Sequence, residues 1–169
     1  MEAIEALQQR RSNRLFLDKQ ISQDELNKIL QCGLNAPSGK NKQDTKLVVI
    51  QDQKTLKELS KLNAFIMKTE SDPFYHAPTL IIVFAPQDSV NRIKDGSAVL
   101  TNLQNGAYAL NIGSCWINRA KEMFELPEGK KYLDKWHLTG YEGVGCCVLG
   151  YNQKEPQQIK RKENRIIFD

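Results

Sequence analysis

The spacing of apolar residues predicts one well-defined helix near the start of the chain. Between Ser22 and Leu34, apolar side chains recur every three or four positions, which places them on one face of a helix. Ser22 and Glu25 form the S-x-x-E pattern of a capping box at its beginning, and Pro37 cannot continue it. We therefore predict a helix over 22–34 with a buried stripe of Leu26, Ile29, Leu30 and Leu34.

The most apolar helical pattern lies in the middle of the chain, from Gly96 to Ile112. Because this pattern carries few charges, we expect a helix that is buried on nearly all sides. Gly113 is well placed as its C-terminal stop. Shorter helices are expected over 3–11, 54–62, 121–124 and 128–136, the first with Ile4 and Leu7 on one face.

Continuous apolar runs predict the strands of a sheet. The run "TLIIVFA" over 79–85 is uninterrupted and ends at Pro86, which is typical of a central strand covered on both faces. The stretch 68–78 is irregular, and no repeat or linker divides the chain. Helices mixed with buried strands predict a helix-covered sheet in an α+β or α/β fold, as a single domain over 1–169. The other strands are expected over 46–50, 114–118 and 144–151.

Composition and charge exclude several classes of protein. The 169 residues are 40% apolar and 26% charged, as in an ordinary globular domain. No window is long and apolar enough to span a bilayer, and the N-terminus lacks the apolar core of a secretory signal. We therefore expect a cytoplasmic protein without a membrane partner. The formal net charge of +4 is mild, and the basic clusters lack interleaved aromatic residues, so no nucleic-acid partner is expected.

The four cysteines and two histidines show no metal-ligand spacing. No C-x-x-C pair occurs, and no metal site is predicted. The cysteines are interpreted as small buried hydrophobic residues in a reducing compartment. On a strand, the adjacent Cys146 and Cys147 would point to opposite faces of the sheet.

Two basic clusters near opposite ends of the chain are candidates for anion binding. The first, "RRSNR", contains Arg10, Arg11, Ser12 and Arg14, and its guanidinium forks match phosphate oxygens. The second, "KRKENR" over 160–165, is its counterpart near the C-terminus. The clusters could meet around one anion. Taken alone, each is more typical of a solvated helix end or basic tail.

The loop "NAPSGKN" over 35–41 is a candidate for binding a flat heterocycle. Gly39 would let a ligand approach the backbone closely, while Ser38 and Asn41 add adaptable polar groups. The loop matches neither a phosphate-binding P-loop nor a Rossmann fingerprint. A plain turn between helix and strand is the alternative.

Side chains suited to acid–base or nucleophilic catalysis are scarce. No G-x-S-x-G elbow occurs, and neither histidine lies in a recognisable nucleophile setting. We name no catalytic side chain, and we expect that a cofactor carries any chemistry.

The apolar end "RIIF" over 165–168 would leave an exposed patch, which favours docking on a partner subunit.

Five segments, in this order, resemble the nitroreductase-like flavoproteins. The family begins with R-R-S-x-R, a capped helix start and A-P-S-G-x-N-x-Q, and the stretch from Arg10 to Gln43 is similar. The resemblance covers essentially the whole chain. The other four segments are "HAPTLIIVFA" (76–85), "NGAYALNIGSCWINRAKEMF" (105–124), "GVGCCVLGY" (143–151) and "KRKEN" (160–164).

This resemblance implies a fold, a cofactor and an activity. The implied fold is an α+β sandwich with a central, mostly antiparallel sheet flanked by helices, in a homodimer with swapped terminal segments. The implied cofactor is FMN, bound at the dimer interface. The implied activity is oxidoreduction in a ping-pong sequence, in which NADH or NADPH reduces FMN and a nitroaromatic or quinone accepts the hydride. A flavin store or sensor without turnover, and a dehalogenase-type flavin enzyme on the same scaffold, are the alternatives.

The resemblance also assigns cofactor-binding residues. The phosphate would be held by Arg10, Arg11, Ser12, Arg14, Arg161 and Lys162. The flavin would be lined by Pro37, Ser38, Gly39 and Asn41 of the other subunit, and by the backbone of Asn118 and Arg119 near its reactive nitrogen. Two departures from the family pattern, "QDT" over 43–45 in place of Q-P-W and a short stretch over 62–76, predict a more open substrate pocket.

Overall fold

Four strands form one antiparallel sheet at the centre of the molecule, in the order β1-β2-β4-β3. The computed structural model describes residues 2–169. The two central strands are β2 and β4, and β2 is buried from Thr79 to Ala85, as the apolar run predicts. The α+β fold with a mostly antiparallel sheet is therefore confirmed. The strands are β1 (Lys46–Ile50), β2 (Thr79–Pro86), β3 (Ile112–Ile117) and β4 (Tyr141–Tyr151).

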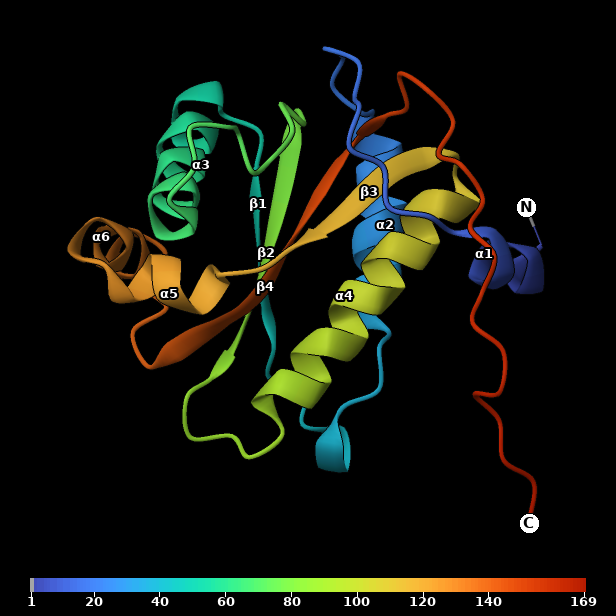
Figure 1. Ribbon diagram of the computed structural model, residues 1–169. Helices are drawn as coiled ribbons and strands as arrows, with labels where there is room; N and C mark the ends of the chain where they lie inside the picture. Colours follow the sequence, from blue (N-terminus) through green and yellow to red (C-terminus); the bar gives the residue numbers. More distant parts are fainter. Residues whose placement is uncertain (1) are drawn as a thin grey trace.

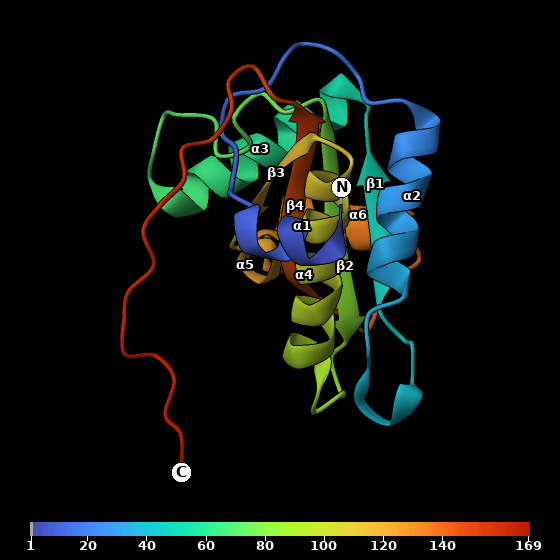
Figure 2. The same ribbon diagram turned by 90° about the vertical axis from the view of Figure 1, so that its right-hand side faces the viewer.

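Helices cover both faces of this sheet and create two hydrophobic cores (Figures 1 and 2). Adjacent residues of β4 divide between them, with Cys146 in one core and Cys147 in the other, as expected for a strand. One face carries α2 (Gln23–Leu34) and α4 (Arg92–Ala109), with α1 (Ala3–Gln9) beside α4. The other face carries α3 (Gln53–Met67), α5 (Ala120–Glu125) and α6 (Pro127–Lys135).

Helix α2 begins with the predicted capping box. The Ser22 hydroxyl accepts the Glu25 N–H at 3.2 Å, and the Glu25 carboxylate accepts the Ser22 N–H at 2.9 Å. Its buried stripe differs from the prediction at Leu34, which is 54% exposed. Gly33 is the buried residue there. It packs so closely against Leu103 of α4 that a side chain at this position would overlap it.

The ends of α4 differ from the prediction. The helix begins at Arg92 and ends at Ala109, so Ile112 and Gly113 belong to β3. Asn111, with φ 59°, makes the left-handed turn after the helix, a conformation that asparagine tolerates. Gly113 is not the helix stop. Because it has no side chain, the side chains of Asn13 and Asn152 can pack directly against β3 at this position.

Several apolar side chains remain exposed in the single chain. Contrary to the prediction of near-complete burial over 96–112, Thr101 of α4 is exposed, and Ile93 in the first turn of the helix, outside the predicted range, is exposed as well. The interpretation of the cysteines as buried is wrong for Cys32, which is exposed. Within residues 2–169, no helix combines the length and apolarity needed to cross a membrane. Exposed apolar side chains occur together on α1 and at the end of the tail, at Ile4 66%, Leu7 58%, Ile166 74%, Ile167 93% and Phe168 91%.

Candidate functional site

The segment that follows α1 lies against the outer edge of β3 and is fixed there by Asn13. The Asn13 backbone N–H donates to the Ser114 carbonyl at 2.8 Å. The Asn13 side chain is buried and donates to the Leu15 carbonyl and to the Asn152 Oδ1, each at 2.8 Å. This anchor holds the flanking arginines beside the chain that leaves β4.

The two basic clusters meet around one cavity of about 490 Å³. Lys154 and Glu155, from the segment after β4, form part of its wall, whereas Lys162 is exposed and does not line it. Within residues 2–169, none of the four arginines of this cavity pairs with a carboxylate. The predicted phosphate-binding residues that line the cavity are Arg10, Arg11, Ser12, Arg14 and Arg161.

Arg10 experiences the positive charge of this cluster directly. Its Nη1 donates at 3.2 Å to Oε1 of Gln104, a buried side chain of α4. The pKa of Arg10 is lowered, first by its partial burial and then by repulsion from Arg11 and Arg161. Since an arginine remains charged at neutral pH, an anion in the cavity would relieve this repulsion.

The other side chains of the cluster have local partners. Arg11 Nη1 donates to the carbonyls of Gln8 at 3.2 Å and Arg10 at 2.6 Å, while its Nε is buried without a partner. The Arg14 guanidinium lies 5.8 Å from the centre of the Tyr75 ring, and the hydrogen bond to Tyr75 is the main cause of the raised pKa of Arg14. Tyr75 had no signal in the sequence that linked it to this site.

Ser12 connects the cavity to the sheet. It lies near the buried thiol of Cys115 on β3, which donates to the Trp116 carbonyl at 3.6 Å. Burial raises the pKa of Cys115, and the nearby Arg14 and Ser12 oppose that increase only in part. The thiol therefore stays protonated at neutral pH, where it packs as a small apolar group.

The loop over 35–41 is anchored to the first turn of α4. The Gly39 N–H donates at 3.0 Å to Oδ1 of Asp95, and a side chain on Gly39 would overlap Asn91. Within one chain, the backbone at Gly39 is therefore packed closely against the start of α4. Pro37 and Ser38 line a small cavity of about 210 Å³ together with Asp95.

A tight turn completes this loop. Lys40 and Asn41 both have left-handed backbone conformations, with φ 56° and 54°. The Ser38 hydroxyl accepts the Gln43 N–H at 3.0 Å, and the Asn41 Oδ1 accepts the Gln43 Nε2 at 2.7 Å. The polar groups predicted for ligand binding therefore also stabilise the turn.

One chain does not bring the loop and the arginine-lined cavity together. The loop contacts α4 at Asp95, whereas Arg10 contacts it at Gln104. Those nine residues of helix correspond to about 14 Å along its axis. Figure 1 shows the loop after α2 and the segment after α1 at opposite ends of α4.

The third predicted element, Asn118 and Arg119, lies between the end of β3 and α5. These two residues line a cavity of about 410 Å³ with Ile93 and Val144. Both are held by Asn63 of α3, which is fully buried. Asn63 Nδ2 donates to the Asn118 carbonyl at 2.9 Å, and its Oδ1 accepts from Arg119 Nε at 3.0 Å. Sequence patterns missed Asn63, because its contacts join positions 55 and 56 residues apart.

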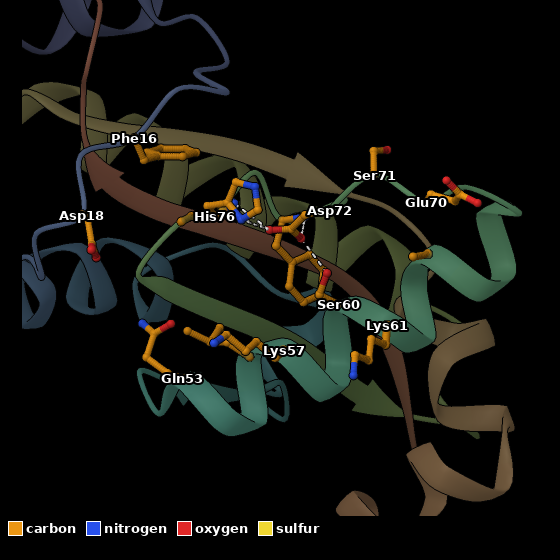
Figure 3. A pocket seen from close by; sticks show the side chains of 14 residues that line it. Phe16, Asp18, Gln53, Lys57, Ser60, Lys61, Glu70, Ser71, Asp72 and His76 are labelled. Atoms are coloured by element: carbon orange, nitrogen blue, oxygen red, sulfur yellow. Dashed lines mark hydrogen bonds and ion pairs between the residues drawn. The ribbon is translucent and has the colours of Figure 1, made fainter.

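A further cavity of about 550 Å³ lies between α3 and the irregular stretch over 68–78. Figure 3 shows the side chains of Ser60 and His76 directed at Asp72. The Ser60 hydroxyl donates to Asp72 at 2.5 Å, and the backbone N–H groups of Phe74 and His76 donate at 2.8 and 2.7 Å. Because Ser60 donates to a carboxylate that is already saturated with donors, this group stabilises a turn and does not activate a nucleophile.

Comparison with known proteins adds family context to this geometry. A sequence model described as the nitroreductase family matches residues 7–73. A relative from Archaeoglobus fulgidus, named as an inferred NADH dehydrogenase/NAD(P)H nitroreductase, is 32% identical over 123 residues, which cover 69% of this chain and 67% of the relative.

Two solved structures share the whole fold. A nitroreductase with bound FMN from Bacteroides fragilis NCTC 9343 aligns with a TM-score of 0.91 and 28% identity, covering 100% of this chain and 99% of that one. An FMN-dependent nitroreductase from Clostridium difficile R20291 aligns with a TM-score of 0.85 and 25% identity, covering 99% of each chain.

Proposed function

This chain belongs to the nitroreductase family, and we propose that it is an FMN-dependent oxidoreductase driven by NADH or NADPH. Nitroaromatic or quinone-type compounds are the proposed acceptors, and both half-reactions use the same cofactor in ping-pong order. FMN bound in the Bacteroides fragilis structure, and the FMN dependence named for the Clostridium difficile protein, support the cofactor assignment. A cytoplasmic location remains a prediction from the sequence.

The observation that carries this proposal is the arginine-lined cavity. Among the described residues, the four guanidinium groups that surround it have no carboxylate partner, and the buried Nε of Arg11 has no acceptor. A phosphate monoester carries nearly two negative charges and several acceptor oxygens, so this donor set suits the phosphate of FMN. The residues present therefore fit the cofactor.

Different parts of the chain would take different roles around the cofactor. Arg10, Arg11, Ser12, Arg14 and Arg161 would bind the phosphate through charge-assisted hydrogen bonds. FMN would supply the hydride chemistry that no side chain of this site offers. The Asn118–Arg119 turn would face the flavin with its backbone. No side chain is needed as a general base.

We further propose that the active form is a homodimer. The exposed apolar residues of α1 and of the tail need a cover, and a second copy of the chain would provide it. The same assembly would bring the loop over 35–41 of one subunit to the arginine-lined cavity of the other. Pro37, Ser38, Gly39 and Asn41 would then line the flavin, and Lys162 would approach the phosphate only if the tail moves on assembly.

The phosphate assignment is tested with Arg10→Ala combined with Arg161→Ala. This double variant should purify without flavin, because it removes two of the four arginines around the phosphate. The measurement is the ratio of flavin to protein absorbance, with circular dichroism as the check on folding. Lys28→Ala with Lys54→Ala removes the same number of charges from exposed positions outside both basic clusters and should keep its flavin. A folded Arg10/Arg161 variant with a full complement of FMN contradicts the assignment.

The catalytic assignment is tested separately, on wild-type protein loaded with FMN. NADH or NADPH added without oxygen should bleach the flavin absorbance, and a quinone added afterwards should restore it. Flavin that neither nucleotide reduces would instead support a store or sensor.

A further inference from the structure

We propose that Asn63 is a positioning residue, which fixes the Asn118–Arg119 peptide so that the Arg119 N–H points into the flavin-facing cavity. This inference rests on the proposed function, since it assumes that FMN lies against this turn. It assigns a role in the chemistry to a side chain on α3 that does not itself line the cavity.

The first observation is the backbone conformation of Arg119. With φ 74° and ψ 17° it lies in the left-handed region, which is unfavourable for a residue with a Cβ atom. Such a conformation persists only where the surroundings enforce it. Arg119 therefore needs a partner that holds the turn between β3 and α5.

Asn63 provides that hold at two successive residues. It is fully buried, and its amide donates to the Asn118 carbonyl at 2.9 Å and accepts from Arg119 Nε at 3.0 Å. Its second donor contact, to the Met123 sulfur at 3.1 Å, ties the same amide to α5. One side chain thus fixes both a carbonyl before the turn and the guanidinium after it.

Because the peptide bond is planar, fixing the Asn118 carbonyl also fixes the direction of the Arg119 N–H. In a trans peptide the carbonyl and the following N–H point to opposite sides. Because the Asn118 carbonyl points to Asn63 on α3, the Arg119 N–H points away from α3. The cavity is lined by this turn, by the start of α5, by the first half of β4 and by Ile93 of α4, but not by α3. Helix α4 lies on the other face of the sheet from α3. Within residues 2–169 this N–H has no hydrogen-bond acceptor.

The opposite side of the turn is also restrained, by β4. A side chain on Gly143 would lie 2.8 Å from the carbonyl carbon of Ala120 and 2.9 Å from its oxygen. The backbone of α5 therefore rests directly on the strand, and the turn cannot relax in that direction. A donor held in this way is pre-organised, and a fixed donor beside a flavin tunes its electron affinity.

The decisive variants are Asn63→Leu and Asn63→Asp. Leucine keeps a similar volume without hydrogen bonds, and aspartate keeps the acceptor for Arg119 but loses the donor to the Asn118 carbonyl. Both should bind FMN within about twofold of wild type, because the phosphate site lies elsewhere. We expect about a tenfold weaker preference for reduced over oxidised flavin, which is about 30 mV for a two-electron couple. The kcat should fall about tenfold while the KM for NADH changes less than twofold.

Arg119→Gly supplies the matched control, because glycine adopts this conformation without strain. In the Asn63→Leu background, Arg119→Gly should restore at least half of the change in flavin redox potential, since the turn no longer needs Asn63 to hold its conformation. A merely structural Asn63 predicts no such rescue. Potentials of Asn63→Leu and Asn63→Asp that equal wild type, or a double variant no better than Asn63→Leu, overturn the proposal.

Amide exchange of the wild-type protein tests the same idea without any variant. The Arg119 N–H should exchange rapidly in flavin-free protein and at least tenfold more slowly once FMN is bound. Exchange that is unchanged by bound FMN overturns the positioning role while the proposed function stands. A protein that binds no FMN at all overturns the proposed function, and this inference with it.

Discussion

A single hydrogen bond connects the loop over 35–41 to the long helix. It runs from the Gly39 N–H to Asp95, whose other carboxylate oxygen is buried and has no partner among residues 2–169. Asp95 is only 6% exposed and lies in the first turn of α4, where the helix dipole favours a negative charge. The position of a loop proposed to line the flavin thus depends on one buried carboxylate.

We predict that Asp95→Ala lowers the free energy of unfolding by about 1.5–3 kcal/mol, the usual contribution of a hydrogen bond to a charged group. Asp95→Asn should cost about 1 kcal/mol or less, because its Oδ1 still accepts the Gly39 N–H. Urea denaturation of both variants against wild type measures the difference. Equal losses in the two variants would show that this hydrogen bond does not hold the loop.

At the scale of residues, the basic clusters of the site could be predicted from the sequence, whereas the side chains that contact the site from distant parts of the chain could not. The clusters at Arg10–Arg14 and around Arg161 stand out as runs of closely spaced cations, and the structure places Arg10, Arg11, Arg14 and Arg161 around one cavity. Asn63 and Tyr75 make their contacts across more than fifty residues of sequence. No local pattern marks such pairs, because only the packing of α3 and of the stretch over 68–78 brings them to the site.

At the scale of elements, the start of α2 is fixed to the end of β4. The Glu25 carboxylate accepts the Ser22 hydroxyl at 2.6 Å and the Tyr151 hydroxyl at 2.7 Å. The pKa of Glu25 is lowered below its ordinary 4.5, mainly by the Ser22 hydroxyl and then by Tyr151. The charged form is therefore favoured in the folded protein.

The lowered pKa of Glu25 determines how the folding stability changes with pH. A lowered pKa contributes stability above the ordinary value of 4.5, and that stability is lost as the pH falls through the folded pKa. We predict that wild type loses stability more steeply than Glu25→Gln between about pH 5 and pH 3. Tyr151→Phe should show an intermediate slope. Urea midpoints measured across this range test the prediction, and parallel slopes for all three proteins contradict it.

The sequence predicted the existence of the elements better than their ends. The span of β1 and the buried run of β2 could be predicted because β-branched and apolar residues stand in uninterrupted runs. The end of α4 could not, since apolar residues continue from the helix through Leu110 into β3 without a change in character. There the backbone reverses at Asn111, and Gly113 serves packing inside the sheet.

At the scale of the whole molecule, the C-terminal tail extends away from the sheet without a strand or helix of its own (Figure 1). Its last apolar residues are almost fully exposed. Together with the apolar residues of α1, they form the surface that the proposed second copy would cover.

We predict that Ile166→Ser, Ile167→Ser and Phe168→Ser together weaken the homodimer without unfolding the chain, since these side chains contribute almost no burial in the single chain. Light scattering should give twice the 19.3 kDa mass for wild type and a lower, concentration-dependent mass for the triple variant. Phe65→Ser is the control, because Phe65 is 73% exposed on α3, on the other side of the molecule. A triple variant that stays dimeric at high dilution would argue against docking of the tail.

The placement of the loop and the arginines at opposite ends of α4 has a genetic consequence. If each flavin site combines one end from each subunit, a chain without Arg10 and Arg161 and a chain with a disrupted Gly39 loop are defective for different reasons. In a mixed two-fold dimer the two intact halves meet at one of the two flavin sites. With random pairing half of the dimers are mixed, so co-expression should restore activity at about a quarter of all sites. Two inactive alleles that complement each other in one cell would be the signature of a shared site.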